Sequence, residues 1–280
     1  MTLGRLGRMA YVNTLPVDWG LVKGPLGKLV QLHQGPPTEL NKLMAEGRLD
    51  LSPVSSVAAA RHADEWLVLD DLCIGCRGEV GSVILHSDRP VEDLHGLPIA
   101  VTGASATAAK LLEVLLARHW RTTAKLVPQD SPAEARLLIG DAALKTAQCE
   151  SSGFIYDLGL EWRKFTGGDF VFGLWCVRRE FAYKYPAETR ALHDLLRTSY
   201  ALGRVQFRGV VAEASRIVGL PEPIIRDYYP KLVYDLDDRL WTGLALFLGF
   251  LGYGAGCLER FGPDRRSLPA SRTHGHECAI

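Results

Sequence analysis

Residues 97–116 constrain the fold of this 280-residue chain most, because they combine a strand, a tight turn and a helix in one stretch. Residues 97–102 are apolar and partly β-branched, which is typical of a buried strand. The turn at residues 103–107 contains only small residues, and leucines at helical spacing follow it. A helix N-terminus directs free backbone N–H groups outward and favours an anion. The residues expected to hold that anion are Ser105, Ala106 and Thr107.

The same pattern recurs at two other predicted strand ends. Ser55 and Ser56 stand where a strand at residues 49–54 turns into a helix, and Gly140 and Asp141 follow a strand at residues 135–139. In open α/β sheets ligands bind outside the carboxyl ends of the strands. We therefore expect the three turns to line one site.

Asn13 is a further candidate, because it follows the first predicted strand, residues 3–9. Its amide either caps the next helix or reaches into the site. Asp141 has the same two interpretations, as a cap of the helix that begins at Ala142 or as a base. Ser82 lies on a strand predicted at residues 80–87, where its hydroxyl is either an ordinary strand side chain or a ligand contact.

The order of elements predicts an α/β fold with two lobes, a ligand cleft between them and a helical C-terminal part. Residues 80–87 and 169–178 bracket the middle of the chain, so they are the expected crossings between lobes. The first lobe is predicted to comprise residues 1–87 and 171–262, and the second residues 88–170. Residues 263–280 are polar and are expected to form a flexible tail.

Composition excludes several classes of partner. The 32 basic and 32 acidic residues give zero formal net charge, which argues against nucleic acid or an anionic membrane surface. The six cysteines are scattered, and no apolar run of signal-peptide length opens the chain, so a cytoplasmic protein with reduced thiols is expected. The uncharged stretch from Leu240 to Gly256 is shorter than the roughly 20 residues that span a bilayer, which favours a buried helix.

Familiar cofactor and nucleophile motifs do not occur in the sequence. The turn after residue 102 lacks the later glycine of a dinucleotide fingerprint, and neither a Tyr-x-x-x-Lys pair nor a Gly-x-Ser-x-Gly elbow is present. Cys73 and Cys76 have no second pair, and the residues from His274 to Cys278 lie in the expected tail. No metal or cofactor is therefore predicted.

Six segments form a collinear pattern between about residue 4 and residue 179: Tyr11-Val-Asn-Thr-Leu-Pro16, Ser52-Pro-Val-Ser-Ser56, Gly78-Glu-Val-Gly-Ser-Val83, Ser105-Ala-Thr107, Ile139-Gly-Asp-Ala-Ala-Leu144, and Tyr156-Asp-Leu158 with Trp162 and Thr166-Gly167. Together they resemble the chorismate dehydratases of the futalosine route to menaquinone. The resemblance implies the fold of type II periplasmic solute-binding proteins, used here by an enzyme. Where the family has Thr-Gly-Leu-Pro-Phe-Val-Phe, this chain has Gly168-Asp169 in place of Leu-Pro, so a different loop is expected there.

The resemblance also implies a reaction, in which chorismate loses water to give 3-[(1-carboxyvinyl)oxy]benzoate. Aromatisation of the ring drives the loss, so no redox cofactor or metal is demanded. The protein then has to hold a small dicarboxylate and assist proton movement. The carboxylates are assigned to Ser55, Ser56, Ser105, Ala106 and Thr107, with a further contact from Ser82.

Two catalytic roles and two other functions remain as hypotheses. Asn13 is expected to orient the substrate or its departing hydroxyl, and the base is either Asp141 or one of the substrate's own carboxylates. The same fold also suits a non-catalytic binder of small carboxylates. The sister enzyme that makes 1,4-dihydroxy-6-naphthoate shares both fold and pathway, but the Asn-Thr-Leu-Pro and Ile-Gly-Asp-Ala-Ala-Leu runs favour the dehydratase.

Overall fold

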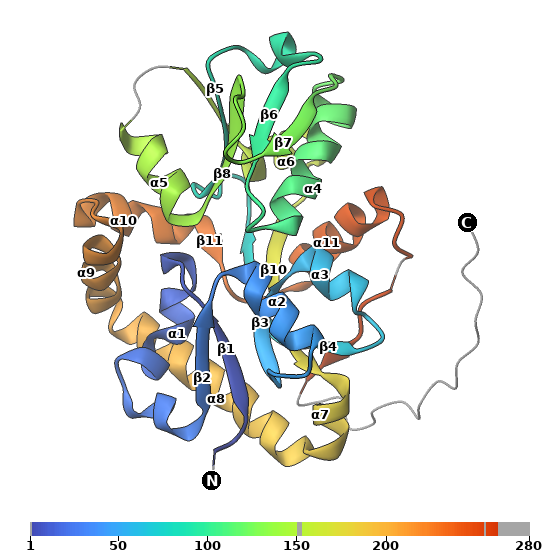
Figure 1. Cartoon of the computed structure of the whole chain (residues 1–280). Helices are drawn as coiled ribbons and strands as arrows, with labels where there is room; N and C mark the ends of the chain where they lie inside the picture. The colour runs from blue at the N-terminus through green and yellow to red at the C-terminus, as the bar shows by residue number, and fades with distance from the viewer. Residues whose placement is uncertain (1, 150–152, 255, 263–280) are drawn as a thin grey trace.

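The computed structural model describes residues 2–149, 153–254 and 256–262, which form two α/β lobes with a sheet in each (Figure 1). In these residues the first sheet has the order β11-β4-β10-β3-β1-β2, with β12 beside β4, and the second has the order β7-β6-β8-β5-β9. The first sheet comprises β1 (Arg5–Met9), β2 (Gln31–Gly35), β3 (Leu51–Ser55), β4 (Trp66–Cys76), β10 (Phe170–Arg178), β11 (Leu232–Val233) and β12 (Arg260–Phe261). The second comprises β5 (Val83–Ser87), β6 (Pro98–Val101), β7 (Lys125–Pro128), β8 (Ala135–Ile139) and β9 (Phe154–Asp157). The predicted two-lobed α/β fold is confirmed.

Helices cover both sheets, and they dominate the chain after Arg178, as the sequence predicted. The α-helices are α1 (Leu15–Val22), α2 (Pro37–Ala45), α3 (Ser56–Arg61), α4 (Ala106–Val114), α5 (Gly140–Cys149), α6 (Leu158–Thr166), α7 (Arg179–Lys184), α8 (Pro186–Val205), α9 (Phe207–Val218), α10 (Glu222–Tyr228) and α11 (Asp238–Phe250). Shorter 3-10 turns are η1 (Val12–Thr14), η2 (Pro25–Leu29), η3 (Val91–Leu94) and η5 (Tyr229–Lys231), and a π-helical turn, η4 (Leu115–His119), extends α4.

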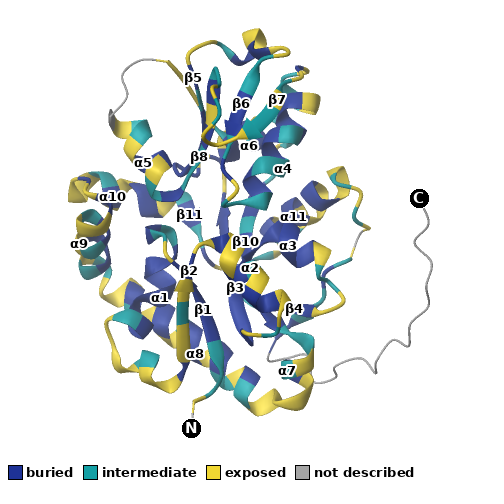
Figure 2. Cartoon of the chain, viewed as in Figure 1, coloured by how far each residue is buried: buried dark blue, intermediate teal, exposed yellow. Residues whose placement is uncertain are grey.

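The core of the first lobe is built around β10, whose nearly continuous apolar sequence suits a strand with both faces covered. Its neighbours β3 and β4 pair with it antiparallel, and Trp175, Cys176 and Val177 are fully buried (Figure 2). On one side α8 packs closely on α1, because Gly203 lies against the backbone of Pro16, where a Cβ would come within 2.0 Å of the carbonyl oxygen. This contact fixes the helix that follows Asn13.

The crossing between the lobes precedes β5 rather than following it, which corrects the predicted lobe boundary at residue 87. Val83–Ser87 pairs along its length with β8 and with β9, so it belongs to the second sheet. The chain leaves the first sheet through residues 77–82. The stretch from Cys73 to Cys76 is the end of β4, so the first sheet extends up to this connection.

Asp157 joins the outgoing and returning connections between the lobes. Its carboxylate caps α6 by accepting a hydrogen bond from Leu160 N at 3.0 Å. The same carboxylate accepts from Val80 N at 3.1 Å and from Gly81 N at 2.6 Å on the outgoing connection. One side chain therefore fixes both connections at the same point.

The apolar stretch that begins at Leu240 forms α11, as predicted, with Leu240, Leu244 and Phe247 buried against the protein. Gly243 allows this approach, because a Cβ there would lie 2.0 Å from the Asp169 carbonyl oxygen. Among the described residues, no helix combines the length and the apolar character needed to cross a bilayer. The predicted tail at residues 263–280, with His274 and Cys278, lies outside the described residues.

Candidate functional site

The turns predicted to line a site meet at the junction of the two lobes. Because β1 and β3 are parallel, Asn13 and Ser55 follow the same edge of the first sheet. In the second sheet β6 and β8 are likewise parallel, so Ser105 and Asp141 share an edge. Two side chains predicted as site residues link these edges, because Thr107 Oγ1 accepts from Val57 N at 3.1 Å and Asp141 Oδ1 accepts from Val12 N at 3.2 Å.

The hydroxyl groups at these turns already have hydrogen-bond partners, but most of them keep a proton to donate. Ser55 and Ser105 are the N-caps of α3 and α4, and each accepts a backbone N–H at 3.2 Å. Since Thr107 also acts as an acceptor, none of these three O–H groups has an acceptor within the described part of the chain, and each can donate to a carboxylate. Ser56 differs, because its hydroxyl donates to the Val171 carbonyl at 2.7 Å.

Ser82 lies in the connection before β5 and belongs to the same cluster. Its backbone carbonyl accepts from Gly140 N at 2.8 Å, which places it beside the turn that carries Asp141. Its hydroxyl accepts from the Tyr228 hydroxyl at 2.9 Å in a buried contact. The Ser82 proton is therefore also available to a bound acceptor.

Asn13 does not cap the following helix. Thr14, not Asn13, occupies the N-cap position of α1, and its side chain makes no capping bond among the described residues. Asn13 Oδ1 is buried and has no hydrogen-bond partner within that part of the chain. A buried amide oxygen without a partner costs about 1–3 kcal/mol, and at the junction a bound substrate would remove this cost. The structure therefore favours the interpretation of Asn13 as a ligand contact.

Asp141 does not act as the predicted cap, because α5 begins one residue before it and the carboxylate extends across the junction to Val12 N. Burial raises the pKa of Asp141 above its usual range, with smaller opposing effects of the Val12 N–H and Lys145. A carboxylate with a raised pKa is better matched to proton abstraction near neutral pH. The ring of Tyr11 covers this turn by packing against Gly140, whose φ of 58° suits glycine.

Three tyrosines complete the junction, and no feature of the sequence had pointed to them. Tyr228, Tyr229 and Tyr234, here called the tyrosine clamp, come from α10, η5 and the residue after β11. The Tyr229 hydroxyl donates to the Val12 carbonyl at 3.0 Å, and the Tyr234 hydroxyl donates to the Asn13 carbonyl at 2.6 Å. Tyr229 and Tyr234 lie 217 and 221 positions from their hydrogen-bond partners in the sequence. A sequence motif does not predict contacts between residues so far apart.

Asp18 contacts the turn that contains Asn13, and its titration makes the stability of the protein depend on pH. The side chain is buried, accepts from Thr14 Oγ1 at 2.8 Å and lies 3.3 Å from Arg8 Nε. Burial raises the pKa of Asp18 to about 6, against the opposing effects of Arg8 and Thr14. The native state thus keeps a proton that the unfolded chain releases near pH 4. The contribution of this proton to the free energy of unfolding is therefore complete below about pH 4, and it is lost as the pH rises through about 6.

This titration predicts a difference between the native protein and an Asp18→Asn variant. Relative to the variant, the free energy of unfolding of the native protein is expected to fall by up to about 3 kcal/mol between pH 4 and pH 7. Urea denaturation of both proteins at several pH values measures this difference. A difference that stays constant with pH contradicts the prediction.

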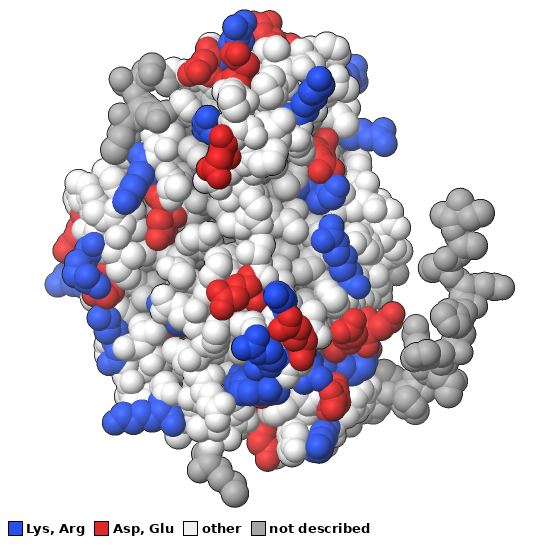
Figure 3. Space-filling model, in the orientation of Figure 1, with Lys and Arg blue, Asp and Glu red and all other residues white. Residues whose placement is uncertain are grey.

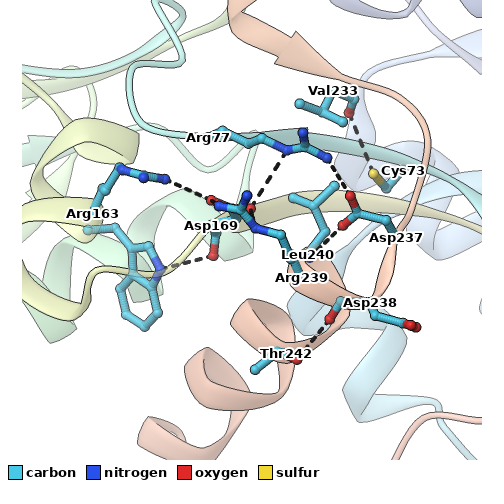
Figure 4. A network of polar contacts seen from close by, with 11 residues as sticks. Cys73, Arg77, Arg163, Asp169, Val233, Asp237, Asp238, Arg239, Leu240 and Thr242 are labelled. Atoms are coloured by element: carbon cyan, nitrogen blue, oxygen red, sulfur yellow. Dashed lines mark hydrogen bonds and ion pairs between the residues drawn. The ribbon is translucent and has the colours of Figure 1, made fainter.

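The departure from the family pattern at Gly168-Asp169 has a clear structural role. The Asp169 carboxylate is 1% exposed and faces three arginines, Arg77, Arg163 and Arg239 (Figure 4). Arg163 Nη1 donates to Asp169 Oδ1 at 2.9 Å, and Arg239 Nε lies 3.3 Å from Asp169 Oδ2. Arg77 also pairs with Asp237, which caps α11. The substituted residue therefore links α6, α11 and the connection between the lobes.

Two further features concern the surface of the protein. A hollow of about 740 Å³ is lined by Trp120, Tyr156 and Glu161 among others and includes none of the predicted site residues. It extends to Glu79 and Asp157 at the connections between the lobes. Lys, Arg, Asp and Glu are interspersed over the face seen in Figure 3. Among residues 2–149, 153–254 and 256–262, no group of three His, Cys, Asp or Glu side chains is placed to hold a metal ion.

Comparisons with known proteins agree with both the fold and the motifs. A sequence profile described as menaquinone biosynthesis matches residues 4–252. The chain is 30% identical to a chorismate dehydratase of Thermus thermophilus over 88% of this chain and 94% of the relative, and 31% identical to one of Campylobacter jejuni over 64% and 70%.

Solved structures confirm the predicted periplasmic-binding-protein-like fold. Protein AF1704 from Archaeoglobus fulgidus has a TM-score of 0.71 at 17% identity, covering 89% of this chain and 96% of that one. The alkanesulfonate-binding protein SsuA from Xanthomonas axonopodis, bound to MOPS, has a TM-score of 0.65 at 16% identity, covering 92% and 98%. Together with the sequence matches, these findings show that the chain belongs to the menaquinone biosynthesis family and is a homologue of chorismate dehydratases.

Proposed function

We propose that this protein is a chorismate dehydratase, a hydro-lyase that converts chorismate to 3-[(1-carboxyvinyl)oxy]benzoate and water. The observation that carries the proposal is the 30% identity with the Thermus thermophilus enzyme over nearly the whole of both chains. The reaction removes one proton from the ring carbon that bears the ether and the hydroxyl from its neighbour. The products contain all atoms of chorismate, so no co-reactant is required.

The junction supplies groups that suit a dicarboxylate. Ser55, Ser105 and Thr107 retain O–H donors, and the first turn of α4 adds N–H groups at Ala106 and Thr107 that have no acceptor within the helix. Ser82 donates from the connection between the lobes. Ser56 contributes through its backbone N–H, since its hydroxyl is bonded to Val171.

Asn13 and Asp141 provide the chemical groups of the proposal. The Asn13 amide accepts from the departing hydroxyl of the substrate through Oδ1, which is unpaired in the described part of the protein. Asp141, on the facing edge, takes the ring proton unless a substrate carboxylate does so, and the acquired proton leaves with the substrate hydroxyl as water while the C–O bond breaks. A cytoplasmic location is part of the proposal, because Cys73, Cys76 and Cys176 are buried as free thiols.

The decisive experiment mixes the purified protein with chorismate. Loss of the diene absorbance together with a product lighter by the mass of one water supports dehydration. Unchanged chorismate contradicts the proposal, whereas saturable binding without product identifies a binding protein instead. Turnover of a cyclised futalosine in place of chorismate identifies the naphthoate-forming activity.

The role of Asp141 has its own test in the pH dependence of kcat/KM. If Asp141 is the base, the acidic limb of the profile lies above the usual carboxyl range, because burial raises the pKa of the group that must be ionised. Asp141→Asn is expected to lower kcat/KM by about 100-fold or more and to remove that limb. A variant that keeps the wild-type limb and rate excludes Asp141 and favours the substrate carboxylate.

A further inference from the structure

We propose that Tyr229 and Tyr234 of the tyrosine clamp are positioning residues that set the direction of the Asn13 side chain, with Tyr234 as the principal member. The inference rests on the proposed function for its catalytic consequence, but the positioning itself is independent of the substrate. The clamp lies in the C-terminal part of the chain, outside the six motifs that carry the family resemblance.

The backbone around Asn13 is held at three successive carbonyl groups. Tyr11 O accepts from Thr14 N at 3.4 Å and from Thr14 Oγ1 at 3.3 Å within the turn. The next two carbonyls, of Val12 and Asn13, accept from the hydroxyls of Tyr229 and Tyr234 at 3.0 and 2.6 Å. Since the peptide groups on both sides of the Asn13 Cα are fixed, the direction of its Cα–Cβ bond is fixed as well.

The clamp has a rigid base on the first sheet. In β11, Leu232 pairs with Cys76 and Val233 with Gly75 at the end of β4. The Tyr234 carbonyl accepts from Cys73 N at 2.9 Å, so the residue is bonded on both its backbone and its hydroxyl. The Tyr234 hydroxyl is therefore carried by the sheet rather than by a free loop.

The clamp also reaches the connection between the lobes. Tyr228 donates to Ser82 Oγ at 2.9 Å, and its ring packs so closely on Gly81 that a Cβ there would lie 3.3 Å from the ring carbon Cδ2. Lys231 Nζ pairs with Glu79 Oε1 at 2.6 Å beside it. The same short segment thus orients the Asn13 amide and the Ser82 hydroxyl from one side.

The hydroxyl groups of all three tyrosines are suited to act as permanent hydrogen-bond donors. Tyr228, Tyr229 and Tyr234 are 3%, 4% and 6% exposed. Burial raises the pKa of each phenol above its ordinary value, so the hydroxyl protons stay in place at physiological pH. A buried donor bonded to a backbone carbonyl gives a fixed geometry at little entropic cost in the assembled protein.

The test removes single hydroxyl groups through Tyr234→Phe and Tyr229→Phe. In Tyr234→Phe, hydrogen exchange at the amides of residues 12–14 is expected to increase at least tenfold, with exchange in β10 and α8 unchanged. With chorismate as substrate, kcat is expected to fall about tenfold while KM stays within about twofold. In an Asn13→Ala background, Tyr234→Phe is expected to change kcat less than twofold, because it acts through Asn13.

Tyr200→Phe is the matched control. The Tyr200 ring packs 5.5 Å from the Tyr234 ring, and the residue is 8% exposed, but its hydroxyl lies toward Asp235 instead of the Asn13 turn. Unchanged exchange at residues 12–14 in Tyr234→Phe overturns the proposal, as does a kcat loss that is fully additive with Asn13→Ala. If the wild-type protein leaves chorismate intact, the proposed function fails, and the exchange measurement alone decides the positioning role.

Discussion

Replacement of Asn13 by alanine is expected to lower kcat for chorismate dehydration by about two to three orders of magnitude, with a small change in KM. Alanine removes the amide whose oxygen has no partner among the described residues. It leaves the turn intact, because the backbone bonds of Val12 and Asn13 to the clamp remain. Steady-state kinetics with chorismate and urea denaturation of the same preparation separate loss of chemistry from loss of folding.

Asn41 provides a matched control for this change. It is the other asparagine of the chain, and its Oδ1 is also buried with no partner in the described part of the chain, but it lies on α2. Asn41→Ala is therefore expected to keep the wild-type kcat. Full turnover by Asn13→Ala, or an equal loss in both variants, contradicts a central role for Asn13.

Replacement of Asp157 by alanine is expected to reduce the free energy of unfolding by about 3 kcal/mol. The change removes the cap of α6, worth about 1 kcal/mol, and also leaves the N–H groups of Val80 and Gly81 without an acceptor. The effect is large because one carboxylate serves two segments that are 76 residues apart. The midpoint and slope of urea denaturation measure it.

Asp237→Ala is the corresponding control, since Asp237 also caps a helix through a bond to Leu240 N at 2.9 Å. Its carboxylate is 41% exposed and accepts that one backbone N–H, so a loss of about 1 kcal/mol is expected. If the two variants are equally stable, the bonds of Asp157 to Val80 N and Gly81 N contribute nothing to the free energy of unfolding.

The sequence was informative where the determinants are local. Apolar runs followed by small hydroxyl residues predicted β3 with Ser55 and β6 with Ser105, and both serines cap the helices expected of them. The parallel order of the strands then placed these turns at facing edges. Such inferences depend on neighbouring residues and on general rules of sheet geometry.

The sequence was less informative where pairing is remote. The sheet to which residues 83–87 belong is decided by contacts such as Val83 with Ile139, which no property of the segment itself reveals. The carboxylate of Asp141 could be placed on a helix start, but its bond to Val12 spans 129 residues. The tyrosine clamp has the same character, because Tyr234 resembles any buried aromatic until Asn13 is found beside it.

Asp169 shows that a family pattern is not a set of interchangeable residues. The proline that the resemblance implies at this position would offer no carboxylate to Arg77, Arg163 and Arg239. Without Asp169, the partly exposed Arg163 and Arg239 would lose the carboxylate that they share, while Arg77 would keep Asp237 as its partner. Residue 169 and these arginines therefore act as one unit, and a change at residue 169 alters the electrostatic environment of α6, α11 and the connection between the lobes together.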